Sequence, residues 1–400
     1  MTFLSTERRS SLDDVLAGEL TRLRDLDRER TLRRVEHRRG AIVDTVFGAA
    51  VDFSSNDYLG LASDPRLVAA AARALADQGV GAAAARLIAG NNPEHDALET
   101  ELARYFAVER ALIFSNGYTA NVGIIPALVG RGDVVFSDAL NHASLIDGCR
   151  LSRAEVHVYP HRDMRVLAAL LDRHRGSARR ALIVTDGLFS MDGDFAPLGE
   201  IVELARRFDA WTYVDDAHAL GVVGDDGRGS LVRANVAGEV DVVIGTFGKA
   251  FGVAGAFVLG SATLIQYLVN RARSFVFSTG MMPAQAAAAR EGLRIAALEP
   301  ERRAVVRRNS RLMRAALDAA GVAPLAVNEE PTHIIPVMIG EDARTMRIGR
   351  ALGRRGFLVA AIRPPTVPDG GARLRITVNA AHTEDQIAEF TAALATSLHE

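Results

Sequence analysis

The stretch WTYVDDAHALGVVGDDGRGSLVRANVAGEVDVVIGTFGKAFG, residues 211–252, decides the fold class of this chain. It contains two short runs rich in β-branched residues, and each run ends in polar residues. Both runs are apolar on both faces, which is typical of strands that helices cover on each side. Seven such runs occur along the chain, at 111–115, 133–138, 155–160, 181–187, 211–217, 241–247 and 255–260. Their alternation with helical or loop segments predicts an α/β domain with a mainly parallel seven-stranded sheet and helices on both faces.

Polar side chains collect just after several of these strands. The segments Ser115–Asn121, Asp215–His218 and Thr246–Lys249 each follow an apolar run directly. In open α/β sheets, ligands bind at the carboxyl ends of the strands. The sequence therefore predicts one cleft to which several strand ends contribute.

The rest of the chain differs in its pattern of predicted helices and strands. Asp64-Pro65 and Asn92-Pro93 each place a capping side chain before a proline at the first helical position, so we expect helices to begin there. After residue 285 we expect one long helix over 284–320, a strand at 332–340, a helix at 343–355 and extended segments at 357–368 and 372–383. This pattern predicts a smaller α+β domain at the C-terminus. We expect an N-terminal helical arm over 1–50 with one or two amphipathic helices over 10–36, a large domain over 51–290 and a small domain over 291–400.

Composition limits the function classes. The formal net charge of −2 over 400 residues gives no general attraction to nucleic acid or to an anionic membrane. The arginine-rich run at 30–39 is either a solvated helix face or a ligand site. No apolar run is long enough to span a membrane, and the first residues do not resemble a signal peptide. With Cys149 as the single cysteine, a reducing compartment is expected, and the cytoplasm is the predicted location.

Lys249 has two interpretations. A lysine just past a strand end is ordinarily a surface residue. However, Gly245, Gly248 and Gly252 surround it, and glycine lets the backbone approach a ligand closely. In such a site, near a cationic ring, the pKa of a lysine would fall and its amine could form a Schiff base.

The other polar segments also have two interpretations each. Asp215 either caps a turn or binds a protonated pyridine nitrogen, and His218 is either a structural histidine or part of the same site. The turn at 115–121 leads into a helix N-terminus, which suits phosphate. His142 either belongs to a helix cap or stacks its flat imidazole on a flat ring.

Several chemistries are disfavoured. The ten histidines are scattered, and no histidine and cysteine group has metal-ligand spacing, so we expect no metal. The chain has no G-x-S-x-G elbow of a serine hydrolase and no Walker A or dinucleotide-binding glycine motif.

Six motifs occur in the order and spacing of the α-oxoamine synthases, and the chain resembles this family from about residue 50 to 395. They are SNGYTAN (115–121), NHASLIDG (141–148), TDGLFSMDGD (185–194), VDDAHALGVVG (214–224), TFGKAFGVAGAFV (246–258) and FVFSTGMMPA (275–284). Two further stretches, DFSSNDYLGL (52–61) and AIRPPTVPDGGARLRITVNAAH (361–382), carry the resemblance within the family. It implies the fold-type I architecture of pyridoxal 5'-phosphate-dependent transferases.

The resemblance also implies roles for individual residues. Lys249 resembles the Schiff-base lysine, Asp215 the partner of the ring nitrogen, and His142 the ring-stacking histidine. His218 and Ser190 resemble the groups around the phenolic oxygen of the cofactor. Positions that match the cofactor phosphate site are Gly117, Tyr118 and Thr246, with Ser278 and Thr279 donated by a second subunit, which implies a homodimer. Asn56 and Arg375 match positions near the amino-acid substrate, and Thr366 and Arg33 match acyl-substrate contacts, with Arg30 or Arg34 as alternatives to Arg33.

The reaction implied is a decarboxylative condensation of an amino acid with an acyl thioester. L-alanine and a thioester of CoA or acyl carrier protein are the expected substrates. Family members that use glycine or serine, and a catalytically silent member acting as a binding subunit, are the alternatives. The chain departs from the family pattern at Ala83 to Ala85 and at Ala219, which leaves the acyl-chain preference open.

Overall fold

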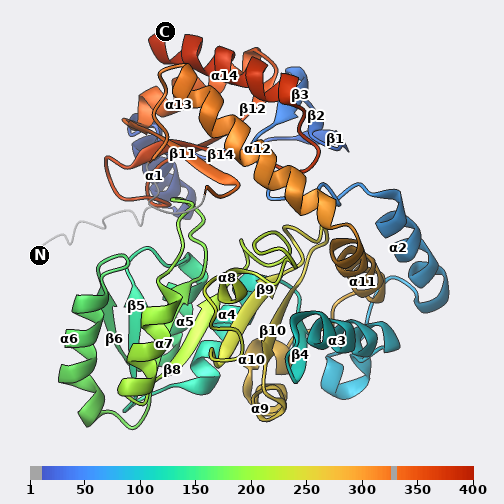
Figure 1. Cartoon of the computed structure of the whole chain (residues 1–400), viewed down its shortest axis with the longest axis vertical. Coiled ribbons are helices and arrows are strands. Elements are labelled where there is room, and N and C mark those ends of the chain that lie inside the picture. Colours follow the sequence, from blue (N-terminus) through green and yellow to red (C-terminus); the bar gives the residue numbers. More distant parts are fainter. Residues whose placement is uncertain (1–10, 326–330) are drawn as a thin grey trace, which may run out of the picture.

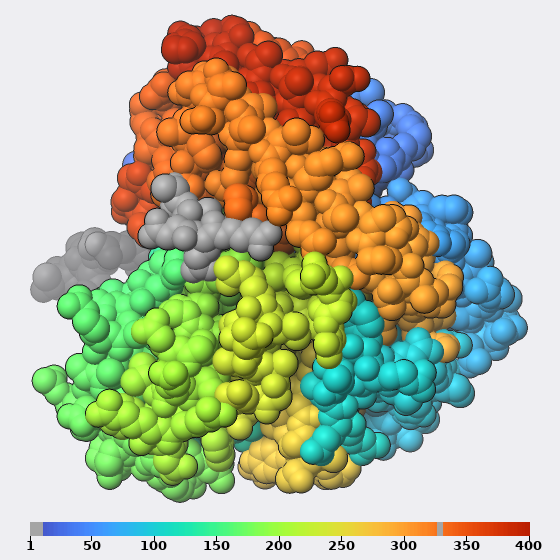
Figure 2. Space-filling model, viewed as in Figure 1, coloured from blue at the N-terminus to red at the C-terminus, as the bar shows by residue number. Residues whose placement is uncertain are grey.

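The computed structural model describes residues 11–325 and 331–400, and these residues form two lobes (Figure 1). The lower lobe contains the seven-stranded sheet. The upper lobe contains two smaller sheets, and it joins the N-terminal strands, blue in Figure 2, to the C-terminal residues, orange and red. Among the described residues, no helix is long and apolar enough to cross a membrane.

The seven predicted strands all form and lie in one sheet. Their order is β4-β10-β9-β8-β7-β5-β6, and only β10 runs antiparallel to its neighbours. The bounds are β4 (Arg110–Phe114), β5 (Val134–Asp138), β6 (Glu155–Tyr159), β7 (Ala181–Asp186), β8 (Trp211–Asp215), β9 (Val242–Thr246) and β10 (Ala256–Gly260). The predicted α/β class with a mainly parallel sheet is confirmed.

Helices cover both faces of this sheet, as the apolar runs predict. Along β7, Ala181 and Ile183 face one core cluster, and Leu182 and Val184 face the other. The first cluster packs against α3 (Pro93–Phe106), α6 (Met164–His174), α7 (Leu198–Arg207) and α11 (Pro283–Leu298). The second packs against α4 (Gly117–Leu128), α5 (Ala143–Ser152), α9 (Ala262–Arg271) and α10 (Arg273–Val276). Short turns η1 (Arg86–Gly90), η2 (Arg175–Ser177) and α8 (Ser230–Arg233) complete the lobe.

The upper lobe joins the two ends of the chain. One sheet has β1 (Val35–Arg39), β2 (Ile42–Thr45), β3 (Gly48–Asp52) and β12 (Phe357–Leu358), and the other has β11 (Ile334–Gly340), β14 (Ala372–Thr377) and β13 (Ala360–Ile362). α12 (Pro300–Ala319), α13 (Asp342–Arg354) and α14 (Glu384–His399) pack on these sheets. Phe53, Phe357 and Phe390 meet in their common core, so this core requires both chain ends.

The helix expected over residues 10–36 is shorter than predicted. α1 (Leu12–Asp25) stops before the arginine-rich run, and the following chain forms strands β1 to β3. Gly40, at φ 61°, turns the chain between β1 and β2, and Arg38 Nη2 donates to the buried Asp52 at 2.9 Å. The strand arises from these long-range contacts, which a helical charge pattern does not reveal. Residues 1–10 of the expected arm lie outside the described residues.

The single helix expected over 284–320 is wrong. The chain forms α11 and α12 instead, with Glu299 between them at φ −116° and ψ 66°. Pro300 has no N–H and its ring excludes the preceding residue from helical conformation, so the helix must break there. Helices α2 (Pro65–Gln78) and α3 begin at the predicted capping residues Asp64 and Asn92.

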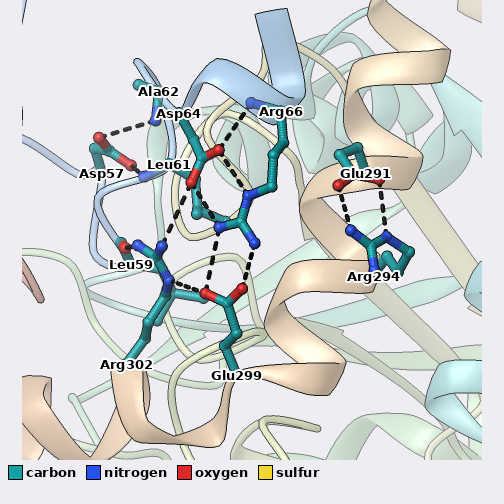
Figure 3. A network of polar contacts seen from close by, with 10 residues as sticks. All are labelled: Asp57, Leu59, Leu61, Ala62, Asp64, Arg66, Glu291, Arg294, Glu299 and Arg302. Atoms are coloured by element: carbon teal, nitrogen blue, oxygen red, sulfur yellow. Dashed lines mark hydrogen bonds and ion pairs between the residues drawn. The ribbon is translucent and has the colours of Figure 1, made fainter. Parts of the chain in front are cut away.

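A network of charged side chains holds the junction of α11 and α12 (Figure 3). Arg66 pairs with both Glu299 and Asp64, and Arg302 Nε donates to Glu299 at 2.7 Å. Arg302 Nη1 also donates to the Leu59 carbonyl at 2.9 Å. The junction therefore ties the start of α2 to the turn at 53–62.

Asp57 fixes the same turn from within. Its carboxylate accepts the Leu61 and Ala62 N–H groups at 2.8 and 3.1 Å, as Figure 3 shows. This turn carries Asn56 and Tyr58 toward the candidate site.

His161 ties a second segment to the sheet. Its Nδ1 lies 3.0 Å from Asp138 Oδ1 at the end of β5, and its Nε2 lies 2.9 Å from Asp194 Oδ2. Asp194 belongs to the segment 187–196, which carries Ser190. Burial disfavours the charged imidazole, but the hydrogen bonds that His161 donates to Asp138 and Asp194 outweigh burial and raise the pKa of His161 to about 9.

The raised pKa predicts a loss of stability at high pH. Since an unfolded histidine has a pKa of about 6.5, the charged ring stabilises the fold fully below that pH, and the stabilisation disappears as the pH rises through about 9. Denaturant unfolding should show a decrease in the free energy of unfolding of at most about 3 kcal/mol across this range. His161→Gln should be less stable at neutral pH and should flatten the pH dependence. An unchanged pH dependence in the variant would contradict this assignment.

Candidate active site

The candidate site lies where the predicted strand ends converge. Asp186 ends β7 and Asp215 ends β8, and the two residues are direct neighbours in the parallel register. Lys249 follows β9, and His142 precedes α5. The charges of Asp215 and Lys249 both act on His142, so the three groups share one small volume.

Lys249 is half-buried, and it is the only lysine of the chain. Burial lowers the pKa of its amine to about 8, although the carboxylates of Asp215 and Asp186 oppose the shift. A large fraction of the amine is therefore neutral at mildly alkaline pH. A neutral amine is a nucleophile and a proton acceptor. The structure therefore favours a chemical role for Lys249 over the interpretation as a surface lysine.

Asp215 is 6% exposed and is supplied with hydrogen-bond donors. Asn121 Nδ2 donates to it at 2.7 Å, and the Ala217 N–H donates at 3.1 Å. His142 is the N-cap of α5, and its own N–H donates to Asp186 at 2.7 Å. Burial lowers the pKa of His142, so its ring is neutral and suited to stacking on a flat ligand.

His218 and Arg375 meet through Tyr58. The His218 Nδ1 lies 2.7 Å from the Tyr58 hydroxyl, and burial holds the pKa of His218 well below its usual range. Arg375 is 4% exposed on β14, and its Nη1 donates to Asn56 Oδ1 at 3.2 Å. Its Nη2 lies 3.4 Å from the Tyr58 hydroxyl, and its Nε donates to the Ser190 carbonyl. Ser190 thus contacts Arg375 through its backbone, and the upper lobe contributes a buried cation to the site.

Among the predicted phosphate residues, Gly117 leaves an open cradle at the start of α4, and Thr246 ends β9. A Cβ added at Gly117 would meet no atom within 4 Å, and Asn116 Oδ1 caps this helix start by accepting the Thr119 N–H at 2.9 Å. The Thr246 hydroxyl donates to the Gly255 carbonyl at 2.8 Å and accepts the Gly248 N–H at 3.1 Å, so it shapes the turn that bears Lys249.

Three other residues expected at the phosphate lie at the surface. Tyr118 is 46% exposed and donates its hydroxyl to Asp147. Ser278 and Thr279 are exposed on the segment after α10. The open cradle at Gly117, the buried carboxylate of Asp215 and the depressed pKa of Lys249 together fit pyridoxal phosphate.

The acyl-contact residues lie in the upper lobe. Thr366 is exposed and accepts a hydrogen bond from Arg30 Nη2 at 3.2 Å. Arg33 instead donates to the Val359 carbonyl at 3.3 Å. Of the three arginines considered, Arg30 is thus the one that contacts Thr366. Burial lowers the pKa of Arg363, and the charges of the nearby Arg30 and Arg33 lower it further.

Comparison with known proteins identifies the family. Residues 49–394 match the family model for aminotransferase class I and II. The chain belongs to this family. It is 50% identical to an 8-amino-7-oxononanoate synthase of Geobacter sulfurreducens over 95% of this chain and 97% of that protein. It is 49% identical to another of Anaeromyxobacter dehalogenans, over 96% of each.

Solved structures of the family agree in fold. A Sphingomonas wittichii serine palmitoyltransferase superposes with a TM-score of 0.91 at 30% identity, covering 97% of this chain and 98% of that one. A serine palmitoyltransferase variant from S. paucimobilis, solved with bound PLP, gives the same values. A Francisella tularensis 8-amino-7-oxononanoate synthase gives 0.75 at 27% identity, covering 88% and 98%. The predicted resemblance and the fold-type I architecture are confirmed.

Four residues that contribute to the candidate site are not among those that the sequence predicts. Tyr58, Asn121, Ser144 and Asp186 all lie inside the recognised motifs, yet no sequence feature distinguishes their buried contacts. Tyr58 joins His218 to Arg375, and Asn121 joins Asp215 to Ser144. The only signal in the sequence was the position of these residues within a motif. Their hydrogen-bond partners follow only from the folded structure.

Ligand-type side chains also gather at a second place, which the spacing in the sequence does not show. Glu155, His157 and His174 hold atoms within 4.8 Å of one another. Glu155 begins β6, so this group lies at the amino ends of the parallel strands, whereas Asp215 lies at the carboxyl end of β8. The group is therefore separate from the candidate site.

Proposed function

We propose that this protein is an 8-amino-7-oxononanoate synthase that uses pyridoxal phosphate. It condenses L-alanine with a pimeloyl thioester and releases CO2 and the free thiol, as a step of biotin biosynthesis. The observation that carries the proposal is Lys249: the only lysine of the chain lies half-buried among Asp215, Asp186 and Arg375, with a pKa of about 8. Identity near 50% along almost the whole length of named synthases supports the same function.

The residues of the site would divide the work of holding the cofactor. Asp215 would bind the ring nitrogen, His142 would stack on the ring, and the start of α4 at Gly117 would receive the phosphate beside Thr246. When bound, the cofactor supplies an electron-withdrawing ring that stabilises negative charge on the α-carbon of the amino acid.

The remaining steps belong to side chains of this chain. Arg375, assisted by Asn56, would hold the alanine carboxylate, and a guanidinium can do so with two parallel hydrogen bonds. The neutral amine of Lys249 would remove the α-proton and later return a proton to the product. The position of the fixed alanine carboxylate determines which bond of the α-carbon lies beside the amine of Lys249. This geometry selects the bond that breaks. Tyr58 and His218 would keep the opposite side of the ring hydrogen-bonded.

We also propose that the active enzyme is a homodimer. Ser278 and Thr279 are exposed on one protomer, which is consistent with a role in the phosphate site of a second copy. All residues of α1 are exposed, including Leu12, Leu16 and Leu20, which form an apolar stripe suited to another chain. The expected division into an arm, a large domain and a small domain remains a proposal. The cytoplasm remains the proposed location, since buried Cys149 cannot form a disulfide within this chain.

A product assay tests the function. Purified protein with pyridoxal phosphate should be offered alanine, glycine or serine, each with CoA thioesters of graded chain length and with the corresponding acyl carrier protein thioesters. We expect CO2 release and aminoketone formation with alanine and the pimeloyl thioester, and little with other pairs. A preference for glycine or serine would move the assignment to another member of the family. Cofactor binding without product from any pair would indicate a silent binding subunit.

A further inference from the structure

A chain of buried hydrogen bonds connects the two groups that would flank the cofactor ring. The Tyr213 hydroxyl donates to Asn121 Oδ1 at 2.6 Å. Asn121 Nδ2 lies 2.7 Å from Asp215 Oδ2 and 2.8 Å from Ser144 Oγ. Ser144 Oγ lies 2.7 Å from His142 Nδ1. Tyr213, Asn121 and Ser144 are fully buried, so each of these polar groups depends on the others for its partners.

The direction of the chain is fixed at its histidine end. The backbone N–H of Ser144 lies 3.3 Å from His142 Nδ1 and caps the helix by donating to it. A backbone N–H can only donate, so Nδ1 must carry no proton. The Ser144 hydroxyl therefore donates to His142 and uses its lone pair to accept from Asn121. The proton of the neutral imidazole then lies on Nε2.

The direction is also fixed at the asparagine. With Oδ1 toward Tyr213, both protons of the Asn121 amide are used, one by Asp215 and one by Ser144. The reversed amide would place its oxygen 2.8 Å from Ser144 Oγ, whose single proton is already donated to His142, so two acceptors would face each other. In this orientation both oxygens of Asp215 accept, Oδ2 from Asn121 and Oδ1 from the Ala217 N–H, and hydrogen bonds of this kind favour the ionised carboxylate.

We infer that Asn121 is a positioning residue that imposes both protonation states: an ionised carboxylate on Asp215 and a neutral, Nε2-protonated imidazole on His142. The inference deepens the proposed function and rests on it for the identity of the ligand. Its consequence is that negative charge is delivered at the ring nitrogen alone, while the stacked imidazole stays uncharged. Asn121 need not touch the cofactor to have this effect.

The unmodified protein provides the first test. Nitrogen-15 NMR of histidine-labelled protein, with the His142 signals assigned through His142→Gln, should show the Nε2–H tautomer both without and with added pyridoxal phosphate. A proton on Nδ1, or a charged His142 ring at about pH 7, would overturn the inference. This measurement does not depend on catalysis or on a folded variant at Asn121.

The second test uses Asn121→Asp, which keeps the shape of the side chain. It places a second carboxyl group against Asp215, and two carboxyl groups at this distance repel each other when both are ionised, so the pair takes up one shared proton as the pH falls. We expect the dissociation constant of pyridoxal phosphate, measured by equilibrium dialysis, to rise about 10-fold or more near pH 8 and to recover as the pH falls. Asn121→Ala should weaken binding without the recovery at low pH.

Tyr213→Phe is the matched control, because it removes a hydrogen bond from the far side of the same amide and leaves the bond to Asp215. It should change the dissociation constant by less than about 3-fold. Asn121→Asp binding with wild-type affinity at pH 8, or a loss that does not vary with pH, would overturn the inference. If these shifts occur but wild-type protein forms no product, the proposed function fails while the role of Asn121 stands.

Discussion

Lys249→Ala is expected to lower the turnover number by about 10⁴-fold or more, because in the proposed mechanism this one change removes both the amine that would bind the cofactor covalently and the proton acceptor. The visible absorption of covalently attached pyridoxal phosphate should disappear in parallel. Lys249→Arg is the matched variant: it keeps the positive charge, but a guanidinium cannot lose its proton. We expect it to be as inactive as the alanine variant.

The composition of the chain makes this prediction unusually direct to check. Since Lys249 is the only lysine, borohydride reduction of the protein with bound cofactor should add the cofactor mass to a single tryptic peptide. The two variants should acquire no such mass while keeping the circular dichroism of the wild type. Turnover above about one per cent of wild type in Lys249→Ala would contradict the assigned role.

Arg375→Ala is expected to raise the KM for alanine about 100-fold, because it removes the proposed charge-assisted contact of two hydrogen bonds with the substrate carboxylate. The KM for the thioester should change much less. Arg375→Lys should recover only part of the loss, since an ammonium group offers a point charge in place of the planar fork.

Control variants separate this effect from a general loss of structure. Arg347→Ala removes an exposed arginine from α13 in the same lobe and should leave both KM values unchanged. Thermal unfolding of Arg375→Ala should be measured as well, because Arg375 also contacts Asn56 and Tyr58. A general loss of turnover with an unchanged KM for alanine would show that Arg375 supports the fold and does not hold the substrate.

Much of the lower lobe could be predicted because its signals are local. The seven strands are short runs of β-branched residues, and the helices at Pro65 and Pro93 begin with a capping side chain followed by proline. The same reasoning fails at Pro300, because the alanine and arginine pattern continues on both sides of the proline although the helix breaks there. It fails again at 35–52, where three strands pair with one another and the last of them also pairs with residues 357–358.

By itself, the sequence determined the fold class and the family. It also identified Lys249, Asp215, His142 and His218 as candidate site residues. The tertiary structure alone decided which groups surround them: Arg375 reaches Asn56 across 319 positions of the chain, and Asn121 reaches Asp215 across 94. The physical reason is that propensities and caps act over a few residues, whereas a buried polar group must find its partner in space. Protonation states and lowered pKa values follow from that burial, so they become predictable only after the chain has folded.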